Sequence, residues 1–305
     1  MPLFSVIIPA HNAALTIIKT LKSVESQSLS DFECIIVCDS CSDDTEAVVK
    51  AFIEGKLKYK TFNVNFKNPS KTRNFGINLA EGKYISLLDS DDWWEADKLN
   101  KHLEAFNLSI NPDIVYDGTI FYKDGNKLKK CRCLPGIPTN FQILTRNPVT
   151  VGSTPSIKAE LLKLSLYDDD LIQAEDGELW WRLKFKHNAV FYGINEFLTN
   201  YRVSSNSLST DYDNHFMNFK LAIEKFKIYS IDLYKQYHKL MFAFQVNSYA
   251  RRALVNNCNK KMALSFFIKS LSYEPFWGFY DCKTFFTTLC SFFIPKFIFK
   301  KIVGN

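Results

Sequence analysis

Residues 70–92 read SKTRNFGINLAEGKYISLLDSDD. Residues 70–80 predict a helix, and the apolar run Tyr84–Leu88 that follows predicts a buried β-strand. This strand ends directly on Asp89-Ser90-Asp91-Asp92. Side chains two positions apart in an extended chain point the same way, so Asp89 and Asp91 can converge on one site.

The same alternation of strand and helix runs through the whole N-terminal third. The predicted strands cover residues 4–8, 32–37 and 57–63, and the predicted helices cover 14–26, a segment beginning at Asp43, and 95–107. Strands that alternate with helices of this length predict an α/β protein with a parallel, doubly wound sheet. Ligands of such sheets collect at the carboxyl ends of the strands, where this sequence places His11-Asn12, Asp39 and Asp89.

The pattern is less regular after residue 112. Residues 113–130 predict a hairpin that turns at Asp124-Gly125-Asn126. Residues 131–156 are rich in Pro, Gly, Thr and Asn and predict a loop over a site. The remaining predicted elements are a helix over 175–186, short strands at 189–192 and 197–201, and helices from 212 to about 272.

Charge divides the chain into two parts. Residues 216–305 contain 14 Lys/Arg against 4 Asp/Glu, whereas residues 1–215 contain 24 against 28. The same C-terminal 90 residues hold 22 of the 46 aromatic side chains. A near-neutral globular part followed by a basic, aromatic region is therefore expected.

The acidic cluster after the fourth predicted strand can be interpreted in two ways. Two close carboxylates repel each other unless a cation lies between them, and Mg²⁺ or Mn²⁺ accept such ligands and complete their shell with phosphate and water. The alternative is a solvated acidic turn that caps the next helix, a role that Asp92 can fill.

Residues 70–92, together with Ile7-Ile8-Pro9-Ala10-His11-Asn12, resemble the inverting glycosyltransferases of family 2, which have the GT-A fold. The resemblance covers residues 4–107 closely and 150–210 more loosely. It implies a GT-A-type, mostly parallel, Rossmann-like sheet with a helical C-terminal extension. The expected parts are a nucleotide-sugar-binding half (1–110), an acceptor and catalytic half of the same domain (111–210), and a helical, basic and aromatic region (211–305).

The resemblance also implies which residues bind the donor and the metal. The donor-binding positions are Pro9, Ala10, Asn12, Asp39, Lys71, Arg73 and Asp89. Asp91 and Asp89 match the pair that binds Mn²⁺ or Mg²⁺, with Asp91 as the direct ligand. Cys38 and Ser40 depart from the family pattern, which has an acidic residue and a glycine at these positions.

A second resemblance concerns the proton acceptor. Residues 174–182 read AEDGELWWR and resemble the acidic motif that supplies the general base, with the match on Asp176 and with Glu175 or Glu178 as alternatives. A carboxylate that takes the proton of an attacking hydroxyl typically accelerates a reaction by about 10²–10⁴. The non-catalytic interpretation is an acidic helix N-terminus with Trp180 and Trp181 buried below it.

The third matching segment begins at Tyr201-Arg202 and resembles the start of a loop that closes over the diphosphate. It implies that Arg202 neutralises the leaving group, a task suited to a fixed guanidinium. Many relatives have a metal-binding histidine where this chain has Ser204, and His215 could take its place.

The C-terminal region has two interpretations. Residues 284–295 are uncharged and lie between lysines, but a spanning helix needs about 20 apolar residues. Contact of an amphipathic, Lys- and Phe-rich element with the membrane surface is favoured, through Lys296, Lys300 and Lys301. The alternative is a helical subdomain that packs its Phe residues onto the core. Nucleic acid is not expected as a partner, because the basic residues form no recognisable binding module.

Together these expectations describe an inverting hexosyltransferase. It would move a sugar from a nucleotide-diphosphate donor, expected to be UDP-linked, to a lipid-diphosphate-linked saccharide in surface polysaccharide synthesis such as O-antigen or capsule. The start MPLFSVIIPAHN resembles a first strand and no signal peptide, so a cytoplasmic location at the inner face of the cell membrane is expected. The alternative is a non-catalytic GT-A-like protein that binds a nucleotide sugar or a partner transferase.

Overall fold

The computed structural model describes residues 1–203, 211–254 and 259–293, and they form two compact units. The N-terminal unit comprises Met1–Pro138 and Pro148–Leu208. The C-terminal unit comprises Thr139–Asn147 and Ser209–Asn305.

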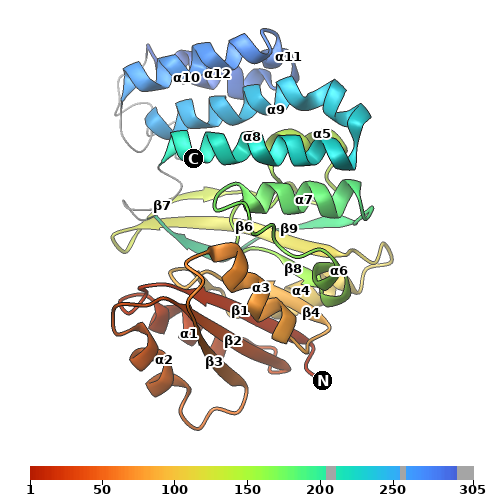
Figure 1. The fold of residues 1–305 in the computed structure, drawn as a ribbon. Helices are drawn as coiled ribbons and strands as arrows, with labels where there is room; N and C mark the ends of the chain where they lie inside the picture. The colour runs from red at the N-terminus through yellow and green to blue at the C-terminus, as the bar shows by residue number, and fades with distance from the viewer. Residues whose placement is uncertain (204–210, 255–258, 294–305) are drawn as a thin grey trace. The chain divides into compact units, whose positions relative to one another are not determined.

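The first half of the N-terminal unit is a parallel sheet in the order β3-β2-β1-β4 (Figure 1). Its strands are β1 (Phe4–Ala10), β2 (Phe32–Asp39), β3 (Tyr59–Val64) and β4 (Tyr84–Leu87). The connecting helices are α1 (Ile17–Glu25), α2 (Thr45–Ile53) and α3 (Pro69–Leu79). The predicted α/β, doubly wound class is confirmed.

Side-chain alternation along β1 explains why helices cover both faces of this sheet. Phe4, Val6 and Ile8 are fully buried in a core shared with α1 and with α4 (Lys98–Phe106). Ile7 faces the other way, toward α3: a Cβ atom on Gly76 of α3 would lie 2.6 Å from its Cγ2 atom. Glycine at this position therefore lets α3 approach β1 closely and fixes the height of Arg73 and Asn74 above the sheet.

The sheet continues from β4 in the order β8-β6-β9-β5, with β7 paired to β6. The strands are β5 (Trp93–Trp94), β6 (Ile114–Lys123), β7 (Asn126–Cys131), β8 (Ser156–Lys158) and β9 (Phe191–Arg202). The helices of this half are α6 (Ala159–Leu164) and α7 (Glu175–Phe185). β8 runs antiparallel to both neighbours, β6 and β9 are parallel, and β5 is antiparallel to β9. The β5–β9 pairing brings the acidic cluster beside Arg202.

The hairpin predicted over residues 113–130 is confirmed as β6 and β7. Two local predictions were wrong. The predicted strands at 189–192 and 197–201 are parts of the single strand β9, whose register against β6 shifts near Gly118. The predicted loop 131–156 contains α5 (Asn140–Arg146), which begins with a capping box of Thr139 and Gln142. The polar composition of residues 131–156 favours a loop, and for this reason the sequence did not predict the short helix.

The C-terminal unit is helical. It consists of α5, α8 (Tyr212–Tyr229), α9 (Ile231–Arg252), α10 (Lys260–Tyr273), α11 (Trp277–Tyr280) and α12 (Cys282–Ser291) (Figure 1). Its interior is aromatic, with Trp277 fully buried against Phe244, Phe267 and Phe285. Across the described ranges, none of the helices is both long and apolar enough to cross a membrane.

Candidate active site

The end of β2 is organised around the buried carboxylate of Asp39. Its Oδ1 atom accepts hydrogen bonds from the Ser40 hydroxyl and the backbone N–H groups of Phe66 and Lys67, and its Oδ2 atom accepts from Asn68 N–H and the Thr72 hydroxyl. Burial alone would raise the pKa of Asp39, but these donors hold it below its ordinary value. Asp39 thus fixes the loop that leads into α3, and its predicted contact with a base stays a prediction.

Three residues with positive φ lie just after β1, β2 and β3. They are Asn12 (φ 48°), Ser40 (φ 54°) and Lys67 (φ 52°). Such conformations in residues other than glycine are uncommon and concentrate at functional loops. The positive φ of Ser40 explains why a glycine would be favoured at this position. Pro9 and Ala10 end β1 beside β2, and Lys71 is exposed on α3.

Arg73 connects the two halves of the N-terminal unit. Its guanidinium is buried and forms ion pairs with Asp89 Oδ1 at 2.9 Å and with Glu175 Oε1 at 3.2 Å. Its Cζ atom lies 5.4 Å from the ring centroid of Tyr167. Burial alone would lower the pKa of Arg73, but the surrounding carboxylates raise it well above its ordinary value. Arg73 was predicted to lie near the donor; in the structure it holds Asp89 and α7 together.

The acidic cluster after β4 divides into two kinds of carboxylate. Asp92 is fully buried: Oδ2 accepts from the Ser153 hydroxyl at 2.6 Å, and Oδ1 accepts from Arg202 N–H at 2.9 Å. It therefore joins β5, β9 and the segment before β8, and does not cap the next helix. Burial, followed by the charge of Asp89, raises the pKa of Asp91 to about 6. Asp89 remains partly exposed.

The candidate base Asp176 lies in the first turn of α7. Its Oδ1 atom accepts a hydrogen bond of 3.0 Å from the buried hydroxyl of Tyr167. A Cβ atom built on Gly152 would lie 3.4 Å from Asp176 Oδ2 and 3.4 Å from Asp89 Oδ2. The two carboxylates therefore converge on one point beside Gly152.

The surroundings of Asp176 differ from those of the two alternative bases, Glu175 and Glu178. Burial raises the pKa of Glu175 to about 7, helped by the charge of Asp176 and opposed by Arg73, with which it forms an ion pair. Glu178 is fully buried and receives two hydrogen bonds from Arg182. Ala174 precedes the helix with φ 60°. Glu178 is thus sequestered, whereas Asp176 faces the point shared with Asp89.

The two tryptophans of α7, Trp180 and Trp181, pack in the core. Trp180 and Trp181 are 1% and 4% exposed, so neither offers a ring to a sugar. The sequence predicts a buried core position for Trp180, and the structure confirms it.

Arg202 ends β9 next to the acidic cluster. Its Nε–H donates to the Asp91 carbonyl at 3.0 Å, and its Cζ atom lies 5.4 Å from the Trp93 ring centroid. Lys19 Nζ lies 3.1 Å from the same centroid. Ser204 lies outside the described residues. His215 belongs to the C-terminal unit, where its Nδ1 atom hydrogen-bonds to the Tyr249 hydroxyl.

The donor set fits a hard divalent cation with few protein ligands. No group of three or more His, Cys, Asp or Glu side chains suited to a metal occurs among the residues that the structure describes. Asp89 and Asp91 are nevertheless close enough that the charge of one raises the pKa of the other. Mg²⁺ and Mn²⁺ commonly bind one or two carboxylates and take their remaining oxygens from substrate phosphate and water.

The structure thus brings Arg73, Asp89, Asp91, Asp176 and Arg202 to one end of the sheet. Asp39 and Asn12 lie at the ends of the neighbouring strands. The roles of all these residues toward ligands stay predictions. Sequence reasoning missed Tyr167, Gly152 and Ser153, whose segments carry no recognisable local pattern.

This chain is similar to known proteins in sequence and in structure. The Escherichia coli UDP-Glc:α-D-GlcNAc-diphosphoundecaprenol β-1,3-glucosyltransferase WfaP is 28% identical over 85% of this chain and 96% of its own length. Staphylococcus aureus TarS 1–349, solved with UDP-GlcNAc, has a TM-score of 0.64 at 18% identity over 93% of this chain and 90% of its own. The mannosyltransferase PcManGT from Pyrobaculum calidifontis, solved with GDP-Man and Mn²⁺, has a TM-score of 0.60 at 15% identity, covering 97% and 87%.

The solved structures have the same fold as this chain. The family described as Glycosyl transferase family 2 matches residues 5–160 of the 305. This match spans β1 to β8 and therefore includes the strand ends that carry Asp39, Asp89 and Asp91. The chain is therefore a glycosyltransferase and belongs to glycosyl transferase family 2.

Proposed function

We propose that this chain transfers a sugar, with inversion, from a UDP-sugar to a saccharide acceptor linked to a lipid diphosphate. The observation that carries the proposal is the convergence of Asp89 and Asp176 beside Gly152. A carboxylate that binds the donor and a carboxylate that accepts a proton then act on one reacting centre. A single displacement requires this arrangement, because the acceptor oxygen attacks as its proton is removed.

The chemistry assigned to Asp176 is proton removal. The acceptor oxygen forms a bond to the anomeric carbon, the bond from that carbon to the diphosphate oxygen breaks, and the acceptor proton moves to Asp176. Tyr167 occupies Oδ1, so Oδ2 is the oxygen proposed to receive this proton. An α-linked donor would give a β-linked product.

The leaving diphosphate requires positive charge. Arg202 is the residue proposed to contact it, and its guanidinium is held beside Asp91 by the hydrogen bond to the Asp91 carbonyl. Asp89 and Asp91 would hold Mn²⁺ or Mg²⁺, which when bound supplies electrostatic stabilisation of the diphosphate. The structure of PcManGT, which has the same fold, contains Mn²⁺ and supports a divalent metal as the cofactor.

The proposed donor and acceptor rest on the relatives. The name of WfaP specifies UDP-Glc and a diphosphoundecaprenol-linked sugar, and the TarS structure contains UDP-GlcNAc. By analogy this chain would extend a lipid-linked saccharide during synthesis of a surface polysaccharide such as O-antigen or capsule.

A transfer assay tests the proposal. Purified protein is incubated with UDP-, GDP- and dTDP-sugars and a synthetic lipid diphosphate-GlcNAc acceptor, with Mn²⁺, with Mg²⁺ or with EDTA. We expect a β-linked product from a UDP-sugar with metal, and loss of product with EDTA that added Mn²⁺ restores. A product that retains the donor configuration, or full activity in EDTA, would contradict the mechanism.

The Tyr167→Phe variant should change the pH dependence of transfer. The Tyr167 hydroxyl lowers the pKa of Asp176, whose net pKa is raised by burial despite Arg73 and this hydrogen bond. A hydrogen bond to a charged group contributes about 1.5–3 kcal/mol, so its loss should move the acidic limb of the kcat–pH profile upward by about one to two units. Tyr59→Phe is the control, because that buried hydroxyl has no partner among the described residues. An unshifted limb in Tyr167→Phe would remove Tyr167 from the proposal.

We also propose that the C-terminal unit contacts an anionic membrane surface. Phe276, Phe279 and Phe286 of the α11–α12 region are 65%, 80% and 58% exposed, in a part of the chain with a large excess of Lys and Arg. Exposed aromatic rings beside cations are typical of interfacial binding. Lys296, Lys300 and Lys301 lie outside the described residues.

Vesicle flotation tests this contact. The protein should float with vesicles containing phosphatidylglycerol more than with phosphatidylcholine alone, and Phe276→Ser/Phe279→Ser should reduce the bound fraction about tenfold. Leu57→Ser, an exposed apolar residue of the N-terminal unit, is the control. Equal flotation of all variants would exclude these rings from membrane binding.

A further inference from the structure

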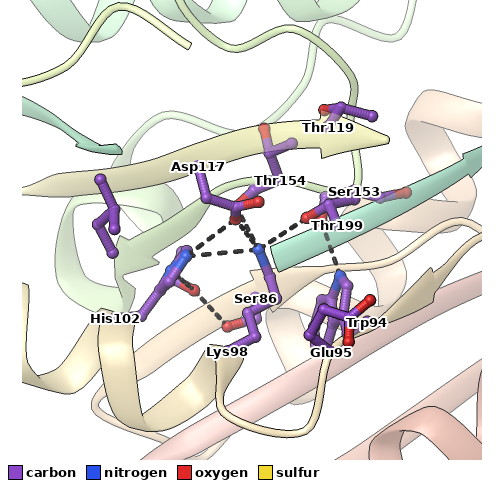
Figure 2. Close-up of polar contacts among 12 residues, drawn as sticks. Ser86, Trp94, Glu95, Lys98, His102, Asp117, Thr119, Ser153, Thr154 and Thr199 are labelled. Atoms are coloured by element: carbon purple, nitrogen blue, oxygen red, sulfur yellow. Dashed lines mark hydrogen bonds and ion pairs between the residues drawn. The ribbon is translucent and has the colours of Figure 1, made fainter. Parts of the chain in front are cut away.

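A buried charged cluster lies within the N-terminal unit, away from the proposed ligand contacts. Lys98 and His102 of α4 and Asp117 of β6 are all 0% exposed (Figure 2). Lys98 Nζ is paired with Asp117 Oδ2, and His102 Nε2 lies 3.1 Å from the same oxygen. Burial, followed by the charge of Lys98, lowers the pKa of His102 to about 4. The imidazole is therefore neutral at neutral pH. Burial also lowers the pKa of Lys98, and the charge of Asp117 opposes this shift.

The cluster holds a specific stretch of backbone, residues 150–156. The Lys98 ammonium donates to the Thr154 carbonyl at 2.8 Å (Figure 2). His102 Nδ1 is bonded to the Ser156 hydroxyl at 2.8 Å. Trp94 Nε1–H donates to the Ser153 carbonyl at 2.9 Å. Because Ser153, Thr154 and Ser156 are bonded to β5 and α4, this part of the stretch has little freedom to move.

The other side of the same stretch contacts the candidate active site. The Ser153 hydroxyl accepts a hydrogen bond from Asp89 N–H at 3.0 Å and donates to Asp92 Oδ2 at 2.6 Å. Gly152 is the residue beside which Asp89 Oδ2 and Asp176 Oδ2 converge. The 150–156 stretch thus lies between the buried cluster and the three carboxylates.

Stability alone does not account for a charged pair at this position. Apolar side chains of similar volume are often as stabilising as a buried ion pair, because desolvation offsets much of the Coulomb attraction. Asp117 Oδ1, moreover, has no hydrogen-bond partner within the described part of the chain. Apolar side chains, however, could not donate to the Thr154 carbonyl or to the Thr199 hydroxyl, which lies 3.0 Å from Lys98 Nζ.

We propose that Lys98 and Asp117 are positioning residues, which hold the 150–156 stretch so that Gly152 and Ser153 set the spacing of Asp89, Asp92 and Asp176. This inference rests on the proposed function, since it assigns the spacing to sugar transfer. Within the described residues, Lys98 forms no hydrogen bond to Asp89 or Asp176 but is connected to Asp92 through Thr154 and Ser153. Misplacement of reacting groups by about 1 Å can lower a rate by about 100-fold.

The test uses the neutral double variant Lys98→Met/Asp117→Asn in the full chain. It removes both charges together, keeps a partner for His102, and deletes the bond to the Thr154 carbonyl. Lys158→Met/Asp113→Asn is the matched control, because this ion pair of 2.8 Å joins the end of β8 to the start of β6. The measurements are kcat and donor KM for transfer, and hydrogen exchange of residues 150–156 in the ligand-free protein.

We expect the Lys98/Asp117 variant to lose about 10- to 100-fold in kcat with donor KM within about twofold of wild type. Exchange over 150–156 should accelerate at least about tenfold while β1 and β2 stay protected. Wild-type kcat in the folded variant would overturn the inference. If wild-type protein transferred no sugar at all, the proposed function would fail, and unchanged exchange over 150–156 would then overturn the inference by itself.

Discussion

The Asp176→Asn variant should lose about 10²–10⁴-fold in kcat with little change in donor KM. Asparagine keeps the shape of the side chain and an oxygen for the Tyr167 hydroxyl. It cannot, however, take up the proton that the attacking hydroxyl of the saccharide loses. Donor affinity should persist, because Asp89 and Arg202 are unchanged. Initial-rate kinetics with a saturating acceptor, together with donor binding by calorimetry, measure the two effects separately.

Two control variants test whether Asp176 is the residue that accepts the proton. Glu175→Gln removes the neighbouring carboxylate that pairs with Arg73, and it should retain much more activity than Asp176→Asn. Asp170→Asn removes an exposed carboxylate ahead of α7 and should be near neutral. If Asp176→Asn transferred sugar at near wild-type rates, the base assignment would be wrong.

The single variant Lys98→Met should destabilise the N-terminal unit by about 3–5 kcal/mol. It leaves the Asp117 carboxylate charged and fully buried without its cation. The pKa of Asp117 is pushed up by burial and held below its ordinary value by Lys98. Thermal unfolding followed by circular dichroism should show a Tm lower by roughly 10 °C.

The double variant distinguishes an unpaired charge from lost packing. Lys98→Met/Asp117→Asn should recover much of the lost Tm, because no isolated charge remains buried. Lys158→Met, at a partly exposed pair, should cost about 1 kcal/mol or less. A Tm of Lys98→Met within about 1 °C of wild type would show that Asp117 does not depend on Lys98.

The parallel half of the sheet could be predicted because its signals are local. The β-branched run at the start of β1 and the acidic residues that open α2 are each read within a few positions. The turn at Asp124-Gly125-Asn126, in the antiparallel β6–β7 hairpin, is equally local. Asp89 and Asp91 could also be predicted as site residues, because they come directly after a strand in the sequence. Strand ends gather polar residues wherever the strands are parallel.

The remaining contacts could not be predicted because they join distant positions. Tyr167 contacts Asp176, and Asn74 of α3 holds the Tyr167 backbone at both its N–H and its C=O. Aspartate is a common helix-capping residue, yet the Asp92 carboxylate accepts its hydrogen bonds from Ser153 and Arg202. Lys98 of α4 is paired with Asp117, which comes from β6. Such pairings depend on the three-dimensional fold and have no sequence period.

The chain path through α5 limits how this protein can be divided. Thr139–Asn147 belongs to the C-terminal unit, although the chain enters from β7 and returns to β8 in the N-terminal unit. Phe141 of α5 contacts Tyr237 and Phe244 of α9, and Arg146 forms an ion pair with Asp281. A single cut near residue 208 would thus separate α5 from its helical partners. Chimaeras that exchange C-terminal regions between relatives would need both stretches from the same parent, so the C-terminal unit should be inherited as two coupled pieces of sequence.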